Sequence, residues 1–276
     1  ITDDVSVMRG GEMVAHLQTA GTSPAELAEL MVGRKVLLEV DHTPADPGAP
    51  VLDVRDLCLT DAAGVEQLKQ ISMTLCEGEI VGIAGVSGNG QSELLDVLSG
   101  IIAPTGGRFT VGTNEVTADT PSDPAELRDF GVAHVPEDRH KCGIILPFSA
   151  AESMILGYSG AEEADSGWWL SPSRLEETCA GRMKEFDIRP PIPKLQSANF
   201  SGGNQQKIVL AREISTQPRL LLVGQPTRGV DIGAIEFIHK QLIALRNEGC
   251  AILLVSVELD EIMSLSDRIL VMNNGQ

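Results

Sequence analysis

The sequence predicts an α/β fold, in which a mainly parallel sheet is flanked by helices and interrupted by a helical insert. Apolar runs of strand length alternate with segments of helical periodicity through most of the chain, which is the pattern of strand–helix–strand units. Hydrophobic residues make up 42% of the 276 residues, but aromatic residues make up only 3%. The predicted core is therefore aliphatic, which suits buried parallel strands covered by helices.

The elements beyond residue 50 follow in a definite order. Residues 51–59 alternate apolar and polar side chains, as a half-buried strand does. The nearly all-apolar run at 79–86 predicts a central strand, and a helix follows it. Residues 147–216 are mostly helical in pattern and form the predicted insert, in which Trp168 and Trp169 are expected to pack. The other predicted elements are a strand at 130–136 and, after the insert, the strand LLLVG, the helix IGAIEFIHKQLIALRNEG, the strand AILLVSV, a short helix and the strand RILVM.

The start of the chain resembles its end. The first residues, ITDDVSVMRGGE, align without gaps with the last residues, LSDRILVMNNGQ. The identical pairs are Asp3 and Asp267, Val7 and Val271, Met8 and Met272, and Gly11 and Gly275. This similarity predicts a tandem protein with a repeat of about 264 residues. Chance similarity between two short segments is the alternative.

The repeat sets the predicted domain boundaries. Residues 1–40 would be the tail of one repeat, with a capped helix within the segment 22–33. Residues 41–50 contain three prolines and a glycine, which predict a stiff linker. Residues 51–276 would form a second, nearly complete repeat.

Charge and cysteine content narrow the classes of function. The net charge of −18 disfavours a nucleic-acid-binding protein, because phosphate contacts need clustered Lys and Arg. The five cysteines form no C-x-x-C pair, which indicates a reducing compartment and argues against a disulfide framework or structural zinc. The sequence has no signal-peptide pattern and no run of about 18 apolar residues. It predicts a cytoplasmic protein that reaches a membrane only through a partner.

A glycine-rich loop, GVSGNGQS, stands between the predicted central strand and its helix. Gly85, Gly88 and Gly90 have the spacing that turns backbone N–H groups inward at a helix N-terminus, where they bind phosphate. Gln91 replaces the lysine that usually reaches the phosphates, and Ser92 stands where a hydroxyl usually binds magnesium. Loss of a charged hydrogen-bond donor costs roughly 1.5–3 kcal/mol. A turn that binds nothing is the alternative to a weakened phosphate loop.

Two further motifs follow the insert. In NFSGGNQQK, Ser201 is a suitable N-cap, and Gly202 and Gly203 leave backbone N–H groups available to an anion. The strand LLLVG then ends at Gly224 and Gln225, where nucleotide hydrolases carry a magnesium-binding acid and a water-activating glutamate. General-base catalysis contributes roughly 10²–10⁴-fold, and glutamine cannot supply it. The sequence therefore predicts that this chain cannot hydrolyse ATP on its own.

These motifs, in this order, resemble those of the nucleotide-binding domain of ABC transporters. GVSGNGQS resembles the Walker A loop, NFSGGNQQK the ABC signature, LLLVGQ the Walker B strand, and PTRGVD the segment through the D-loop, with Asp231 retained. VPEDRHKCGI resembles the Q-loop region with Glu137 in place of glutamine, and SVELDEI the switch region with Val257 in place of histidine. The resemblance covers nearly the whole chain. It implies a P-loop NTPase core with a parallel sheet, an antiparallel β subdomain and the helical insert.

The resemblance also assigns site residues. The implied nucleotide-binding residues are Gly85, Ser87, Gly88, Asn89, Gly90, Gln91 and Ser92, and Ser92 is the candidate for Mg²⁺. The signature residues expected to reach the ATP of a partner half are Ser201, Gly202, Gly203, Asn204 and Gln205. The catalytic positions are degenerate, at Gly224, Gln225 and Val257. The implied cofactors are ATP and Mg²⁺, bound weakly or not at all by this half alone.

A narrower resemblance concerns the transported solute. PEDR, SGGNQQK and PTRGVDIGA are similar to motifs of fused tandem ATPases that power the import of simple sugars and nucleosides, and VGQPTRG favours the nucleoside type. The implied partners are a preceding nucleotide-binding half of the same polypeptide, transmembrane permease subunits at the cytoplasmic face of the membrane and, indirectly, an extracytoplasmic solute-binding protein. Two alternatives remain: a docking scaffold that binds no nucleotide, and a soluble ABC ATPase without a membrane partner.

Overall fold

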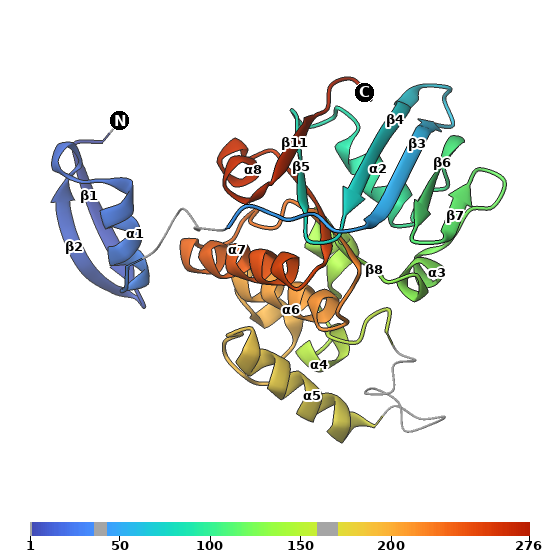
Figure 1. Cartoon of the computed structure of the whole chain (residues 1–276). Helices are drawn as coiled ribbons and strands as arrows, with labels where there is room; N and C mark the ends of the chain where they lie inside the picture. Colours follow the sequence, from blue (N-terminus) through green and yellow to red (C-terminus); the bar gives the residue numbers. More distant parts are fainter. Residues whose placement is uncertain (1, 36–42, 159–170) are drawn as a thin grey trace.

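The computed structural model describes residues 2–35, 43–158 and 171–276, and it has the predicted α/β architecture (Figure 1). A small N-terminal unit lies to one side of a larger body that contains two sheets. Trp168 and Trp169 lie outside the described residues, so their packing stays a prediction.

The central sheet of the body has five parallel strands in the order β11-β5-β10-β9-β8. Strands β9 and β10 are buried along their whole length, as expected for a sheet with helices on both faces. The bounds are Ile80–Ala84 for β5, Val132–Val135 for β8, Leu220–Gly224 for β9, Ala251–Ser256 for β10 and Arg268–Val271 for β11. All five strands were predicted from the sequence.

A second sheet is antiparallel and has the order β4-β3-β6-β7. Its strands are Pro50–Thr60 for β3, Glu66–Cys76 for β4, Gly106–Val111 for β6 and Asn114–Thr117 for β7. This sheet is the antiparallel β subdomain that the resemblance implied. The short strands β6 and β7, and the helix α3 (Pro124–Asp129), were not assigned from the sequence.

The parallel sheet separates two hydrophobic cores. Successive side chains of a strand point to opposite faces. Leu220 and Leu222 of β9 therefore pack into the core shared with α2 (Gln91–Leu98) and the antiparallel sheet. Leu221 and Val223 pack into the other core, which the remaining helices line. Those helices are α4 (Ala150–Ser153), α5 (Pro172–Glu185), α6 (Gly202–Ile214), α7 (Ile232–Asn247) and α8 (Leu259–Leu265).

The described part of the insert is helical, as the sequence predicts. It contains α4, α5 and the 3-10 turn Ser197–Asn199, and it continues into α6. A π-helical turn, η2 (Arg139–Gly143), lies between β8 and the insert. Because α6 packs against both β8 and α7, the insert is anchored to the parallel sheet through this helix.

The N-terminal unit is a hairpin with one helix. Strands β1 (Asp4–Arg9) and β2 (Glu12–Gln18) pair antiparallel, and a 3-10 turn (Thr19–Gly21) leads to α1 (Pro24–Val32). The Ser23 hydroxyl caps α1 by accepting the Glu26 N–H, as the Ser-Pro start predicts. The unit contacts α7 through an ion pair between Arg34 Nη1 and Glu236 Oε2, which are 2.7 Å apart.

The two similar ends of the chain form the same kind of turn. The hairpin turns through Gly10 and Gly11, with φ values of +60° and +86°. At the corresponding positions after β11, Asn274 and Gly275 have φ values of +52° and +79°. A two-residue hairpin turn with both central residues at positive φ favours Gly and Asn. The repeat itself stays a prediction.

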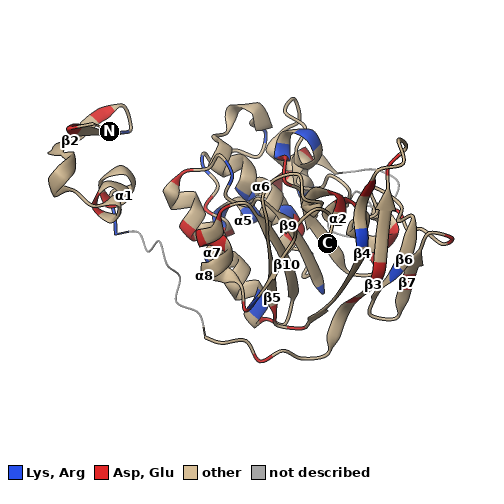
Figure 2. Ribbon diagram, turned by 90° about the horizontal axis from the view of Figure 1, so that it is seen from above, with Lys and Arg blue, Asp and Glu red and all other residues tan. Residues whose placement is uncertain are grey.

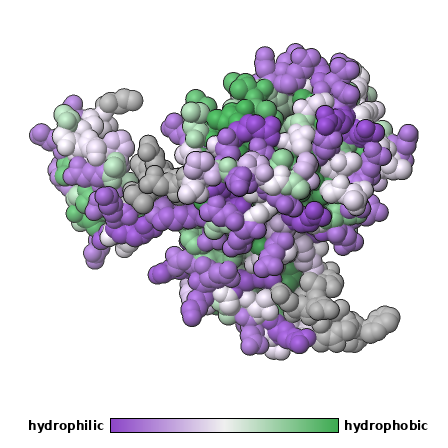
Figure 3. Space-filling view, viewed as in Figure 1, coloured by the Kyte–Doolittle hydropathy of each residue, from purple (hydrophilic) through white to green (hydrophobic). Residues whose placement is uncertain are grey.

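The surface is mainly hydrophilic. Asp and Glu are spread over helices and both sheets (Figure 2). Hydrophobic side chains gather over α8 and β11 on the face shown in Figure 3, where Leu259, Met263 and Val271 are exposed. Among the helices of the described segments, none has the length and apolar character needed to cross a bilayer.

Candidate functional site

The glycine-rich loop connects β5 to α2, as predicted, and its geometry depends on left-handed glycines. Gly88 and Gly90 have φ values of +87° and +104°, a region that side-chain-bearing residues avoid. Gln91 is the first residue of α2, and its side chain is buried. Its Oε1 accepts the Asn89 N–H at 3.2 Å, and its Nε2 donates to the Val86 carbonyl at 3.2 Å. The residue that replaces the expected lysine therefore binds the loop's own backbone.

Residues of four of the predicted motifs meet at one cavity of about 400 Å³. Ser92, at the start of α2, donates a hydrogen bond to Glu137 Oε2 at 2.5 Å. The cavity is lined by Ser87, Gly88, Gln91, Ser92, Glu137, Gln225, Arg228, Val255, Ser256 and Val257. These residues come from the Walker A, Q-loop, Walker B and switch segments. The fold therefore brings together four motifs that are far apart in the sequence. Asn89, Gly85 and Gly90 shape the loop without lining the cavity.

The end of β9 carries no carboxylate. Gly224 is closely surrounded, because a Cβ atom added there would collide with Glu137 Cγ and lie 2.9 Å from Leu95 Cδ1. Gln225 is buried with a φ of +48°, and its Oε1 accepts the Val257 N–H at 3.3 Å. Glutamine cannot take a proton from water. The three predicted degenerate positions therefore lie together and supply no general base.

The fit to Mg²⁺ is partial. Mg²⁺ in nucleotide sites is held by one or two carboxylates or hydroxyls together with phosphate oxygens. Ser92 and Glu137 offer one hydroxyl and one carboxylate side by side. Gly224 offers no ligand where an acid is usual, and the described segments contain no cluster of three or more His, Cys, Asp or Glu side chains suited to a metal. Ser92 and Glu137 are the two side chains that would hold the ion.

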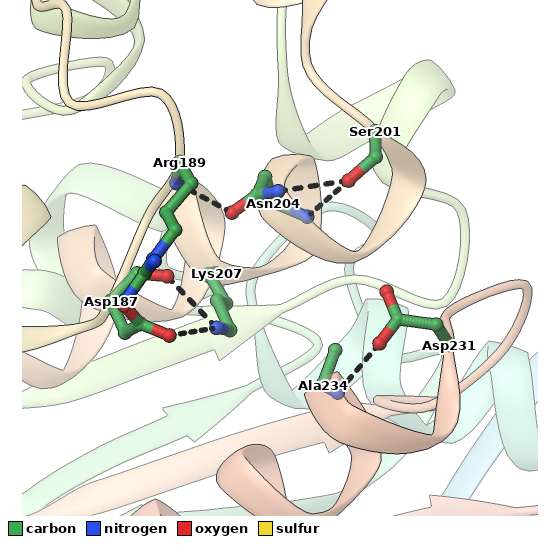
Figure 4. Close-up of polar contacts among 7 residues, drawn as sticks. All are labelled: Asp187, Arg189, Ser201, Asn204, Lys207, Asp231 and Ala234. Carbon is green, nitrogen blue, oxygen red and sulfur yellow. Dashed lines mark hydrogen bonds and ion pairs between the residues drawn. The ribbon is translucent and has the colours of Figure 1, made fainter. Parts of the chain in front are cut away.

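The signature motif caps α6 at its N-terminus. The Ser201 hydroxyl accepts hydrogen bonds from Asn204 N and, at 2.9 Å, from Asn204 Nδ2 (Figure 4). Asn204 Oδ1 in turn accepts the Arg189 N–H at 2.8 Å. Ser201 is exposed. The motif thus presents a capped helix N-terminus, whose partial positive charge favours an anion.

Two of the signature residues after the cap are buried. Gly203 is buried, and a Cβ atom added to it would lie 2.8 Å from Asp231 Oδ2. Gln205 is also buried: its Oε1 lies 2.8 Å from His140 Nε2, and its Nε2 donates to the Ser197 carbonyl. Of the predicted signature residues, Ser201 presents its side chain at the surface, whereas Gln205 uses its side chain to hold α6 in place.

The D-loop residue Asp231 lies against the signature of the same chain. Its carboxylate caps α7 by accepting the Ala234 N–H at 3.0 Å, as Figure 4 shows. One turn further along the same face of α6, Lys207 Nζ donates to the Asp187 carbonyl at 3.0 Å and lies 4.5 Å from the centre of the Phe237 ring of α7. Gly203 and Lys207 therefore lie on the face of α6 that packs against α7.

Sequence reasoning did not single out Arg139, His140 or Arg228. Arg139 Nη1 donates to the Arg228 carbonyl at 2.8 Å, and His140 contacts Gln205. The available signal was their place in quoted motifs, since Arg139 ends PEDR, His140 follows it and Arg228 stands in PTRGVD.

Comparison with known proteins identifies the family. The family model described as "ABC transporter" matches residues 68–228. The chain belongs to this family as an ATP-binding domain, which confirms the resemblance found from the motifs.

Within the family, the chain is homologous to import ATP-binding proteins. It is 40% identical over its whole length to the guanosine import ATP-binding protein NupO of Bacillus subtilis, of which it covers 54%. It is 39% identical over its whole length to the nucleoside import ATP-binding protein NupA of Lactococcus lactis, of which it also covers 54%. Identity to the glucose import ATP-binding protein TsgD13 of Haloferax volcanii is 42%, and the chain covers 50% of that protein. The chain thus spans about half the length of these curated relatives.

Solved structures show the same fold. One is a nucleotide-free ATP-binding cassette of an ABC transporter. The superposition covers 83% of this chain and 89% of the cassette, with a TM-score of 0.70 and 21% sequence identity. Another is a dimeric cassette in a post-hydrolysis state, bound to ADP and Pi. The superposition covers 81% of this chain and 95% of the cassette chain, with a TM-score of 0.69 and 23% sequence identity. The predicted P-loop NTPase fold of the ABC type is therefore confirmed.

Proposed function

We propose that this chain is the non-catalytic second half of an ABC importer ATPase that powers uptake of nucleosides or simple sugars. Residues 1–40 would be the tail of the first nucleotide-binding half, 41–50 the linker and 51–276 the second half. The half-length match to the import ATP-binding relatives and the matching turns at the two ends support this tandem arrangement. The solute would be selected by permease and solute-binding subunits.

The contrast between two sites in one chain carries the proposal. The cavity at the glycine-rich loop lacks the phosphate-binding lysine of a working site, where Gln91 stands, and the switch histidine, where Val257 stands. It also lacks the acid at the end of β9 and the water-activating glutamate that would follow it. The signature at α6 is capped and exposed at Ser201. A half that cannot hydrolyse ATP but keeps its signature is suited to complete the ATP site of a partner half. In this arrangement Ser201, Gly202 and Gly203 would face the γ-phosphate held by the first half.

The chain's own cavity is then a degenerate site. Gln91 satisfies the loop backbone, and Ser92 and Glu137 would hold Mg²⁺ if nucleotide binds. When bound, Mg²⁺ would neutralise phosphate charge. We propose weak nucleotide binding without turnover in this half and hydrolysis at the site of the first half. Closing and reopening of the two halves would move permease subunits at the cytoplasmic face of the membrane through the surface near Glu137 and the helical insert.

The test is a charge placed at the signature without loss of the helix cap. Gly202 is a poor position for it, because a Cβ atom there would lie 2.8 Å from the Gly229 carbonyl oxygen. Ser201→Asp is better, since Asp caps helices about as well as Ser. At about 4–5 Å from a phosphate, an added negative charge costs about 3–4 kcal/mol at an effective dielectric constant of 20. ATPase activity of the full-length protein should therefore fall by roughly a hundredfold or more.

Two controls isolate the charge at the signature. Ser201→Asn is a neutral cap of nearly the same size and should keep most of the activity. Ser171→Asp adds the same charge at the N-cap of α5, away from the signature, and should leave the ATPase activity nearly unchanged. If Ser201→Asp is as active as Ser201→Asn, the shared-site proposal fails. The chain would then be better described as a docking scaffold.

A further inference from the structure

Arg139 occupies the junction of three motifs. It is the first residue of the η2 turn and lies two residues after Glu137, which accepts the Ser92 hydrogen bond. The Asp138 carboxylate caps the turn by accepting the N–H groups of His140 and Lys141 at 2.9 and 3.2 Å. The direction of the Arg139 side chain is therefore set by a well-formed turn.

The Arg139 guanidinium lies between the D-loop segment and the first residue of α6. Its Nη1 donates to the Arg228 carbonyl at 2.8 Å. A Cβ atom added to Gly202 would lie 2.9 Å from Arg139 Nη2, and one added to Gly229 would lie 3.6 Å from it. The glycine that opens the signature helix thus lets the arginine approach closely. This approach links segments that are far apart in the sequence.

A second contact from the same turn fixes α6 one helical turn further on. His140 Nε2 lies 2.8 Å from Gln205 Oε1, and Gln205 is buried. Two successive residues of η2 therefore hold both the first residue and the first turn of α6. A rotation of η2 that moved Arg139 would also move the start of the signature helix.

The Arg139 guanidinium has the charge of the adjacent Asp138 carboxylate near it but is not fully hydrogen-bonded. In the part of the chain that the structure describes, its guanidinium forms no salt bridge, and its buried Nε has no hydrogen-bond partner. The guanidinium donates to the Arg228 carbonyl beside the signature, which an aliphatic side chain of similar size cannot do.

We propose that Arg139 is a positioning residue for the signature. It holds the first residue of α6 against the Arg228–Gly229 segment, in the arrangement that completes the ATP site of the partner half. The inference rests on the proposed function. Its consequence is that the binding-competent arrangement of the signature is mostly formed before ATP arrives, which keeps the apparent affinity for ATP high.

The test compares variants of the full-length protein in steady-state ATPase assays and thermal unfolding. Arg139→Gln removes the charge and most of the guanidinium donors, so a smaller fraction of the protein should have the signature in its ATP-binding arrangement. The KM for ATP should therefore rise about tenfold, and kcat at saturating ATP should change less than about twofold. Arg139→Lys keeps a charge and one donor and should recover part of the KM. Lys141→Gln removes the same charge from the same turn and should match the wild type. The Tm of all three variants should stay close to that of the wild type.

Each other outcome has a defined meaning. If Arg139→Gln matches Lys141→Gln in KM, the positioning role is refuted. If Arg139→Gln lowers kcat and Tm while KM is unchanged, the residue is structural and the inference is also refuted. Ser201→Asp separates the two proposals. If Ser201→Asp loses activity but Arg139→Gln does not change KM, only the inference about Arg139 is refuted. If Ser201→Asp is fully active, the proposed function itself is refuted.

Discussion

Replacing Asp267 by alanine should destabilise the chain by about 3–5 kcal/mol, the usual cost of removing one partner from a buried ion pair. Asp267 Oδ1 lies 2.6 Å from Arg246 Nη1, and the two side chains are only 9% and 2% exposed. Asp267 Oδ2 accepts the Ile80 N–H at 2.8 Å. The carboxylate therefore joins α7 to the starts of β5 and β11, and its removal leaves a buried positive charge without this counterion.

The structure also indicates where in that range the loss should fall. Arg246 keeps its hydrogen bonds to the Thr43 carbonyl and to Asn247 Oδ1, at 2.9 and 2.8 Å. The Ile80 N–H loses its acceptor, which adds roughly 1–3 kcal/mol if water does not reach it. Partial compensation of the arginine and loss of the Ile80 bond act in opposite directions. We therefore expect a loss of about 4 kcal/mol, near the middle of the range.

Urea unfolding at pH 7, followed by far-UV circular dichroism, measures this loss. With an m-value of about 2–3 kcal/mol/M, the midpoint should fall by more than about 1 M. Glu115→Ala is the matched control, because Glu115 pairs with Arg108 at the surface, where the side chains are 50% and 59% exposed. Such a pair is worth about 0–1 kcal/mol. If Asp267→Ala costs no more than Glu115→Ala, the buried pair does not stabilise the sheet as argued.

Two further predictions concern the loop and the partly buried His134. Gln91→Lys frees the loop backbone at Val86 and Asn89 and supplies a charged donor, so the affinity of this half for ADP should rise about tenfold or more in a fluorescent-nucleotide titration. Unchanged affinity would mean that the missing lysine is not what weakens the site. Burial lowers the pKa of His134 to about 4. Between pH 6.5 and 4 the unfolded chain therefore binds a proton that the folded chain does not, and stability should fall by about 2–3 kcal/mol as the pH is lowered through this window. His134→Gln should show a shallower pH dependence in urea unfolding, and equal slopes would contradict the assignment.

Local patterns predicted much of the fold. The apolar runs that became β5, β9 and β10 are recognisable because strands buried on both faces carry no polar alternation. The Ser23 and Ser201 caps were recognisable because N-capping depends on residues close in sequence. The strands β6 and β7 are short and partly exposed, so their pattern is weak, and they were not assigned.

The sequence by itself determined the family, the order of the motifs and the residue types at the motif positions, because each depends on residue identity and near-neighbour spacing. Only the tertiary structure decided how those residues meet. Glu137 lies against Gly224 because β8 and β9 are adjacent in the sheet. Gln205 turns inward to His140, and Arg139 reaches Gly202, because α6 packs across β8 beside the η2 turn. Such contacts follow from strand order and helix packing over long separations in the chain, and no short segment of sequence encodes them.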